Sequence, residues 1–597
     1  MSDSILGSLD AAETIGVGLP VPPVSVADPA VPPPATRGSF EPDDESDDDD
    51  EGVSSGSTFD WVSAPLDTAV VEGCSKLDHS DTDNGERLIR HFGRDILVLA
   101  QEEVASGVFL AWTGTHWDYA GGRALTECIA QGLGDRIGLE AEFLRHTPDE
   151  ERAIAAAVEA FGEDWTSIDP EDLSKPIGRK LKAALKARGA LEKRRRARQI
   201  FGVSSKNKGR VHNMLDMAGP RLRREPEAFN ADALRFACRT HTLQLVREVD
   251  LECPDPDVTR WTARVEATEG HRREDLITAA VPVPWTGTAA PAPRWRAFLE
   301  EMIPDPDKRR TVQAFSGTGL LGVVAQNIMF HYGTGANGKS VFLETLTRVL
   351  GPLAVGLPRE SIVGTGDRGV GAASPDLVRL YGRRMVRILE VKGDVPLQED
   401  LIKKLTGGEK FPVRSLFKGY FEFKSVAAPH MSGNGFPTLD GSDYGTMRRM
   451  LVVHWDQTVP EEKRRDLEEM VAEFVSEEGA GILAWLVEGA LDFLANGLFV
   501  APSVRAATDD YAADMNPIGE FLKACVGSRV DGKVQAQTMF DAYFAWCASN
   551  GRAPKSKTKF GRVVGQRFAK SEIAGRNFYL DCELHDVPEP PARNPSD

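Results

Sequence analysis

The segment at residues 333–340, GTGANGKS, has the residue types and spacing of a loop that holds phosphate groups. It fits the pattern G-x-x-x-x-G-K-[ST], in which glycines allow the positive φ angles that turn backbone N–H groups toward a polyphosphate. In this pattern Lys339 contacts the β and γ phosphates and Ser340 holds Mg²⁺. The residues expected to surround a bound nucleoside triphosphate are Gly333, Thr334, Gly335, Ala336, Asn337, Gly338, Lys339, Ser340 and Val341.

The elements on either side of this segment fit a phosphate loop. Residues 326–332 (QNIMFHY) predict a short buried strand. Residues 340–350 place apolar side chains at helical spacing, and Gly351 supplies a stop. Strand, loop and helix in this order direct a helix N-terminus at the phosphates. The context therefore favours a nucleotide site over a structural glycine turn.

The next hundred residues carry further polar groups at the ends of predicted strands. Residues 384–391 (RMVRILEV) predict a second apolar strand that ends near Glu390. An acid at that position could orient an attacking water or support the metal. A solvated glutamate at a strand end is the alternative. Three more segments follow: LIKKLTGGEKFPVRSLFKGYFEFK (401–424), HMSGNGFP (430–437) and DYGTMRRM (443–450).

In this order, the segments resemble the helicase module of phage and plasmid replicative primase-helicases. The matching parts are GTGANGKS, the strand with Glu390, KKLTGGE, VRSLFKGYFEF, SGNGFP and the run at 443–449 that ends in two arginines. This module is a superfamily 3 helicase with a poxvirus-type motor. The resemblance is strong for about residues 305–502 and weaker on either side. It implies an AAA-type ATPase that forms a ring, expected to be a hexamer, uses ATP and Mg²⁺, moves along single-stranded DNA and unwinds forked DNA.

The resemblance also assigns roles to residues. Glu390 becomes the catalytic acid, supporting the metal together with Ser340, and Asn434 becomes a polar sensor near the γ phosphate. Arg448 or Arg449 becomes the finger that reaches the nucleotide of a neighbouring subunit, where a cation stabilises the charge of the transition state. For the two arginines, an ordinary surface charge pair is the alternative.

One feature departs from the family pattern. Superfamily 3 motors often carry two adjacent acids at the second strand, whereas here Leu389 precedes Glu390 and the next acid is Asp394. Metal support then falls on Glu390 alone or is shared with Asp394, and hydrolysis is expected to be slow.

Residues 411–417 and 420–423 alternate in polarity around Lys418 and Gly419, which predicts a tight hairpin. The resemblance places this hairpin in the central channel of a ring. There Arg414 and Lys418 would contact the DNA backbone, an interaction that is independent of sequence and sensitive to salt. A solvated hairpin tip is the alternative.

The predicted fold class is α/β: an AAA-type P-loop core with an α-rich N-terminal domain and a small winged-helix-like C-terminal domain. The expected divisions are an acidic and proline-rich region (1–80, disordered to about residue 58), the N-terminal domain (81–300), the ATPase domain (301–503), the winged-helix-like domain (504–586) and a disordered tail (587–597). The net charge is −19, but nine acids lie in the single run EPDDESDDDDE at 41–51. The net charge therefore misrepresents the folded part. The run could mimic DNA, recruit a basic partner or only solubilise the chain.

Two basic segments are candidate DNA contacts. Residues 175–198 are helix-favouring and strongly basic, and a solvated helix face is the alternative. In the C-terminal domain, Lys555, Lys557, Lys559, Arg562 and Arg567 would form a basic helix, with a purely structural small domain as the alternative.

Other classes of function find no support in the sequence. The seven cysteines contain no C-x-x-C pair, as expected for reduced cytosolic thiols. There is no uninterrupted apolar stretch long enough for a membrane span, and no signal-peptide pattern, so we expect a soluble, cytoplasmic protein. The resemblance implies the cytoplasm of a bacterial host. The apolar run at 481–502 contains two acids and predicts a core or lid helix. No carboxylate cluster suggests primase activity, so a separate primase or replication initiator is an expected partner.

A replicative helicase is thus the leading interpretation. The runner-up is a nucleotide-switched DNA-binding or origin-recognition ATPase that does not unwind processively. A small-molecule kinase is disfavoured because no segment resembles a substrate lid.

Overall fold

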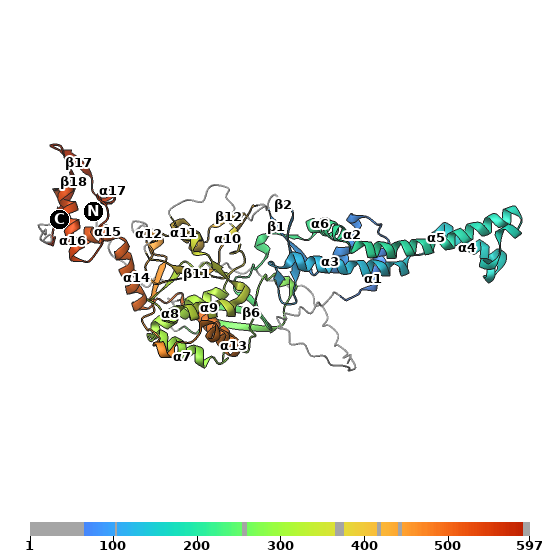
Figure 1. Cartoon of the computed structure of the whole chain (residues 1–597), viewed down its shortest axis with the longest axis horizontal. Helices are drawn as coiled ribbons and strands as arrows, with labels where there is room; N and C mark the ends of the chain where they lie inside the picture. Colours follow the sequence, from blue (N-terminus) through green and yellow to red (C-terminus); the bar gives the residue numbers. More distant parts are fainter. Residues whose placement is uncertain are drawn as a thin grey trace.

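The computed structural model describes residues 65–101, 104–253, 259–364, 375–393, 395–414, 420–439 and 444–588. The molecule is elongated (Figure 1). A central α/β body lies between an N-terminal unit with a long helical arm, on the right of the view, and a small C-terminal unit on the left. Within the described residues, no helix is both long and apolar enough to cross a bilayer.

The N-terminal unit packs helices against one four-stranded sheet, and a second four-stranded sheet connects it to the body. The first sheet has the order β3-β2-β1-β4 and the second has the order β7-β6-β5-β8. The helices are α1 (Thr68–Ser75), α2 (Asp81–Phe92), α3 (Gly122–Leu139), α4 (Pro148–Phe161), α5 (Lys175–Ser205) and α6 (Lys208–Ala218). The strands are β1 (Ile96–Gln101), β2 (Val104–Trp112), β3 (Trp117–Asp118), β4 (Arg223–Arg224), β5 (Arg235–Cys238), β6 (His241–Val249), β7 (Trp261–Glu269) and β8 (Ala280–Val281).

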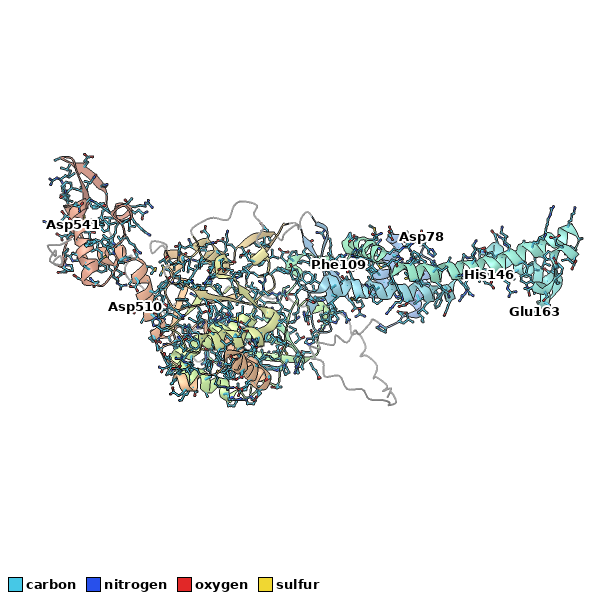
Figure 2. All side chains as sticks on the ribbon, in the orientation of Figure 1. Asp78, Phe109, His146, Glu163, Asp510 and Asp541 are labelled. Carbon is cyan, nitrogen blue, oxygen red and sulfur yellow. The ribbon has the colours of Figure 1, made fainter. Side chains whose placement is uncertain are left out.

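Helices α4 and α5 form the arm. A small apolar core of Ala157, Trp165, Leu181 and Ala184 joins them. Glu163 lies at the far end of the arm (Figure 2), away from the central body. The predicted basic helix at 175–198 is confirmed and continues to Ser205.

A buried ion triad fastens the base of the arm to α1. The Arg87 guanidinium donates to both oxygens of Glu140, at 2.8 and 3.1 Å, and Arg198 also binds that carboxylate. Both arginines also donate to backbone carbonyls at or just after the end of α1, including those of Cys74, Ser75 and Leu77. The Glu140 carboxylate thus faces two guanidinium groups, and their hydrogen bonds to carbonyl oxygens offset part of the cost of burying the second cation.

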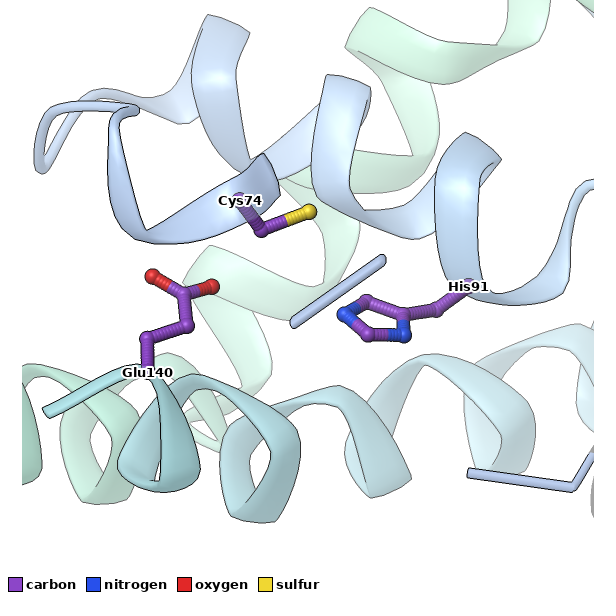
Figure 3. A group of neighbouring side chains, drawn as sticks. All are labelled: Cys74, His91 and Glu140. Atoms are coloured by element: carbon purple, nitrogen blue, oxygen red, sulfur yellow. The ribbon is translucent and has the colours of Figure 1, made fainter. Parts of the chain in front are cut away.

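Cys74 and His91 lie beside this triad, and the side chains of Cys74, His91 and Glu140 point toward one another (Figure 3). Their ligand atoms lie within 4.8 Å of one another, close enough to suggest a metal site. Burial raises the pKa of the Cys74 thiol, which keeps it protonated, and both Glu140 oxygens already bind guanidinium groups. Because two cations neutralise the carboxylate, we interpret the group as structural.

The triad also explains where the sequence-based boundary at residue 80 was wrong. Helix α1 lies after the part expected to be disordered, which ends at about residue 58, and before the expected start of the N-terminal domain at residue 81. Its end is held by Arg87 and also by Arg198, which lies about 120 positions away, so composition near residue 70 could not reveal it.

The central body contains one parallel sheet of order β10-β11-β14-β9-β15. Its strands are β9 (Ile328–Tyr332), β10 (Ala354–Leu357), β11 (Met385–Val391), β14 (Ala428–Gly433) and β15 (Met450–His454), and a separate antiparallel hairpin comprises β12 (Lys410–Arg414) and β13 (Tyr420–Lys424). The helices are α7 (Pro293–Met302), α8 (Pro306–Gly317), α9 (Lys339–Leu350), α10 (Pro375–Val378), α11 (Glu399–Gly407), α12 (Tyr444–Met447), α13 (Leu467–Asn496) and α14 (Pro502–Met515). Four predicted elements are confirmed to within a few residues at their ends: the strands at 326–332 and 384–391, the helix at 340–350 and the hairpin. The helix predicted at 481–502 is also present, but it begins at Leu467 and ends at Asn496.

Both faces of this sheet are covered, as a parallel sheet requires. On one face α7, α8, α9 and α13 pack around Trp295, which is fully buried and stacks on Phe342 of α9 with ring centroids 5.7 Å apart. The buried carboxylate of Glu478 in α13 accepts hydrogen bonds from the backbone N–H groups of Arg294 and Trp295, at 3.0 and 2.8 Å. It thereby satisfies free donors at the start of α7. The other face packs against α11, α14 and part of the N-terminal unit.

Two buried histidines connect the three strands β15, β9 and β14. The Trp455 indole N–H donates to His331 Nδ1 at 3.0 Å, so neutral His331 carries its proton on Nε2. His331 Nε2 then donates to His430 Nδ1 at 3.0 Å. Both imidazoles are fully buried, and this burial lowers the pKa of His430 to about 3 and that of His331 well below its usual range.

The C-terminal unit has its own core. It contains α15 (Pro517–Cys525), α16 (Ala536–Ser549), α17 (Lys557–Arg567) and an antiparallel sheet of order β16-β18-β17, made of β16 (Val526–Gln535), β17 (Lys570–Ile573) and β18 (Arg576–Leu584). The sequence analysis missed β16. Helix α14 belongs to the central body, because Tyr511 is buried in its core and donates to the carbonyl of Pro437 at 2.7 Å. The structural boundary therefore lies near residue 516 instead of 504.

The buried histidine pair predicts a loss of stability in mild acid. Below about pH 6.5 the unfolded chain binds protons at His331 and His430, whereas the folded chain keeps both neutral. The free energy of unfolding should therefore fall with decreasing pH, by up to about 1.4 kcal/mol per pH unit for each histidine. Urea unfolding followed by tryptophan fluorescence between pH 7 and pH 5 measures this slope.

The double variant His331→Phe/His430→Phe should have a shallower slope, and replacement of the exposed His585 serves as the matched control. Equal slopes for the wild type and the double variant would show that the pair is not held neutral.

Candidate nucleotide site

The phosphate-loop segment leaves the carboxyl end of β9 and leads directly into α9. Three of its residues have positive φ: Gly335 (+116°), Ala336 (+47°) and Gly338 (+80°). A Cβ at Gly338 would also lie 2.9 Å from Met302 Cγ and 3.0 Å from the Phe298 ring. Helix α7 therefore packs against the loop at a point where a larger residue is excluded both by space and by backbone conformation.

Lys339 is the first residue of α9, and its ammonium group lies under the loop. Nζ donates to the carbonyl of Gly333 and to Asn337 Oδ1, both at 2.8 Å, and to Asn434 Oδ1 at 3.4 Å. Burial lowers the pKa of Lys339 to about 8, because only neutral oxygens surround the cation. A polyphosphate at this position would supply the missing negative charge and favour the protonated form.

Asn434 follows β14, the strand next to β9. Its side chain is exposed, and its Oδ1 accepts the hydrogen bond from Lys339 Nζ. The predicted sensor and the predicted phosphate-binding lysine are therefore brought together. The turns after β14 and β11 also approach closely, since a Cβ at Gly393 would lie 3.2 Å from Gly435 Cα.

Glu390 lies in a β-bulge of β11. Ile388 pairs with Met431 and Val391 pairs with Gly433, so two residues of β11 oppose Ser432 alone. Glu390 has φ +51°, an uncommon conformation for a residue with a side chain, and it is exposed. A bulge re-aims a side chain, and strained backbone of this kind gathers at functional sites. The bulge turns Glu390 out of the sheet near its carboxyl edge.

Ser340 and Thr334 are exposed, and Val341 is half-buried. Ser340 lies in the first turn of α9, where free backbone N–H groups and the helix dipole favour an anion. The donor set of a serine hydroxyl and a glutamate carboxylate suits Mg²⁺, which binds a few oxygen ligands and keeps several waters. Asp394, the alternative acid, lies outside the described residues.

Arg448 and Arg449 lie at the opposite edge of the sheet. They precede β15, which runs parallel to β9, and the N–H of Ile328 at the start of β9 donates to the carbonyl of Arg449 at 2.7 Å. The phosphate loop starts after the other end of β9, roughly 20 Å away at the usual rise of a strand. Neither side chain can therefore reach the phosphate loop of its own chain.

The two arginines differ in their surroundings. Arg449 is half-buried, and its guanidinium donates to the carbonyl of Gly445. Arg448 is exposed, and among the described residues its side chain has no hydrogen-bond or ion-pair partner. Of the predicted DNA-contacting residues, Arg414 ends β12 opposite Tyr420, and Lys418 lies outside the described residues.

Sequence reasoning missed several residues that support the site. His331, His430 and Trp455 join the strands that carry the loop and Asn434. Asn337 was expected only to surround the nucleotide, yet its Oδ1 also accepts a hydrogen bond from Lys339. Periodicity marked these side chains as buried or polar but could not pair residues about a hundred positions apart.

A family described as "D5 N terminal like" matches residues 85–304. This range covers most of the N-terminal unit and extends through α7.

Two viral proteins are similar in sequence. One is "Putative helicase 022R" of Frog virus 3 (isolate Goorha), with 24% identity over 46% of this chain and 30% of its own length. The other is "Putative helicase L207/L206" of Acanthamoeba polyphaga mimivirus, with 26% identity over 44% of this chain and 29% of its own length. The matched part thus spans less than a third of each viral relative.

Among solved structures, the A-form apo C-terminal region of NrS-1 aligns over 56% of this chain and 95% of its own, with 11% identity and a TM-score of 0.32. A TM-score this low does not support a conclusion about fold or function.

The family match and the two viral relatives agree with the resemblance in the motifs from residue 333 to residue 449. These findings support the resemblance of this chain to phage and viral primase-helicases.

Proposed function

We propose that this chain is an ATP-dependent DNA helicase of superfamily 3, which couples hydrolysis at the candidate nucleotide site to movement along single-stranded DNA and to duplex unwinding. One observation carries the proposal. The phosphate loop and Asn434 follow parallel strands, and the bulged Glu390 lies near the end of a third, all at one edge of a single sheet. In open α/β sheets, ligands bind outside the carboxyl ends of the strands, where the strand order reverses.

In the proposed mechanism, loop N–H groups and Lys339 hold the β and γ phosphates, and Ser340 and Glu390 support Mg²⁺. Glu390 orients the attacking water, and Asn434 contacts the γ phosphate. Phosphoryl transfer depends mainly on such positioning and on neutralisation of charge. Lys339 contacts Asn434, so a bound phosphate would compete with Asn434 for the ammonium group.

The position of the arginines supports a ring. A finger that cannot reach its own phosphate loop must act on the nucleotide of a neighbouring subunit, and Arg448 is the exposed candidate. A hexameric AAA-type ring would place it there. The hairpin β12–β13 would line the channel, and exposed Arg562 and Arg567 of α17 would contact DNA from a winged-helix-like C-terminal unit.

A nucleotide-switched DNA-binding ATPase is the second candidate. It is favoured by the single acid at the bulge, where Leu389 occupies the position of a second carboxylate. Weak metal support would give slow hydrolysis, enough to reset an assembly but too slow to drive processive unwinding.

Two substitutions should separate nucleotide binding from hydrolysis. Lys339→Ala should abolish binding of ATP, because the loop loses its cation. Glu390→Gln should bind ATP but hydrolyse it at least about 100-fold more slowly, because the water loses its base. Strand displacement on forked DNA with ATP and Mg²⁺ should be lost in both variants. Lys463→Ala and Glu462→Gln, on an exposed turn, are the matched controls.

DNA-stimulated hydrolysis by the wild type without strand displacement would instead support the nucleotide-switched ATPase. ATP binding that survives Lys339→Ala would refute the assignment of the site.

A mixing experiment tests action between subunits. Arg448→Ala should lower hydrolysis by about 10³-fold or more, without loss of ATP binding, because the transition state loses a cation. Mixed with Lys339→Ala chains, which have an inactive site but an intact Arg448, it should regain part of its activity. Arg449→Ala is the matched control, since this side chain binds within its own chain.

Failure of the mixture to regain activity, with co-assembly verified by light scattering, would exclude Arg448 as the finger. Full loss of hydrolysis in Arg449→Ala alone would transfer the role to Arg449.

A further inference from the structure

Helix α5 carries a stripe of cations along one side. Lys175, Arg179, Lys182, Lys186 and Lys193 follow one another at intervals of about four, three, four and seven residues, which returns each to the same side of an α-helix. All five are exposed. Helix α4 packs on another side of α5, through the core around Trp165 and Leu181, and so leaves this stripe uncovered.

Most of the stripe has no counter-charge within the described residues. Lys182 pairs with Glu171, but none of the other four stripe cations has an ion-pair partner in the described part of the chain. Two other cations of α5 form ion pairs within the N-terminal unit: Arg194 binds Glu150 and Arg198 binds Glu140. The stripe thus contrasts with Arg194 and Arg198, although Lys180 and Arg196 on other sides of α5 are exposed as well.

The chain itself contains a segment of opposite charge. Residues 41–51 (EPDDESDDDDE) hold nine acids and no cation. Like charges in a row on a helix repel one another, and an oppositely charged segment that lies along them reduces this repulsion. The stabilisation is greatest at low ionic strength.

The connection between the two is long enough for contact within one chain. About 17 residues separate Glu51 from the start of α1, a reach of at most about 56 Å when extended and about 23 Å on average for a flexible chain. The end of α1 touches α5 directly, since Arg198 donates to the carbonyls of Ser75 and Leu77 at 3.3 and 2.8 Å. The tether joins α1 at its other end, about 10 Å along the helix. From Arg198 the stripe begins about 8 Å away, at Lys193, and ends about 35 Å away, at Lys175.

We propose that the acidic segment 41–51 binds the cation stripe of α5 in the same chain. The tether keeps the segment near the stripe at an effective concentration of millimolar order, which a separate chain or a free nucleic acid must exceed. The segment thereby covers a surface that would otherwise attract any polyanion, including a DNA backbone. The proposal concerns the arm alone and does not depend on ATP hydrolysis.

Zero-length carbodiimide coupling of the full chain tests the contact, because it joins a lysine amine only to a carboxylate that touches it. Peptide mass spectrometry should find segment 41–51 linked to Lys175, Lys182, Lys186 or Lys193, and the yield should fall several-fold at high salt. The Lys182–Glu171 pair is the internal positive control. Lys180, exposed on a different side of α5, should be linked to the segment far less often.

Charge reversal adds a matched comparison. Lys186→Glu/Lys193→Glu should lower the links at Lys175 and Lys182 by at least about fivefold. Lys180→Glu/Arg188→Glu, which changes as many charges on the same helix outside the stripe, should leave those links unchanged.

Three results would overturn the proposal. Links from the segment spread evenly over Lys180, Lys463 and the stripe would show that it has no preferred surface. Links that join ¹⁵N-labelled to unlabelled chains would assign the stripe to a second copy. Absence of segment links, together with protection of the stripe lysines from acetylation by added single-stranded DNA, would make it a nucleic-acid surface.

Discussion

Strand β9 is hydrogen-bonded on both sides, to β14 and β15, and all three strands run parallel. This arrangement fixes which groups can meet. The segments that follow the carboxyl ends of these strands lie at one edge of the sheet, and they include the phosphate loop and Asn434. The segment that precedes β15 lies at the other edge and includes Arg448 and Arg449. A phosphate group at the first edge and a cation at the second cannot interact within one chain. Under the proposed function, the same pairing that builds the nucleotide site makes a neighbouring subunit necessary for hydrolysis.

The histidine pair beneath the loop is part of this arrangement. A charged imidazole would be costly in a fully buried position, and each ring is kept neutral by burial and by hydrogen bonds that use the neutral form. The relay from Trp455 through His331 to His430 joins the ends of three strands. The loop that leads to Lys339 follows β9 and Asn434 follows β14, so the relay supports the 3.4 Å spacing between these two side chains. The large apolar cluster around Trp295 holds α9 against the same face of the sheet.

The sequence predicted the parts of the site that are local. The glycine loop, its strand and its helix lie within 25 consecutive residues, and their types depend on periodicity and on φ preferences that single residues express. The bulge at Glu390 could not be predicted, because it depends on pairing with Ser432 of another strand. The buried Arg87–Glu140–Arg198 triad, which orders α1, likewise joins residues that are more than fifty positions apart. Strand β16 was missed for a related reason: it is mostly exposed and polar, and only its pairing with β18 makes it a strand.

The central claim is that the carboxyl edge of the five-stranded sheet binds a nucleoside triphosphate through Lys339. The most direct measurement is a structure of the full chain with Mg²⁺ and a non-hydrolysable ATP analogue. The account predicts β and γ phosphates within the loop at 333–340, with Lys339 Nζ moved from Asn434 Oδ1 to phosphate oxygens and Glu390 facing the metal. An analogue bound elsewhere, or a loop that stays empty at saturating analogue while Lys339 keeps its contacts with Gly333, Asn337 and Asn434, would contradict it.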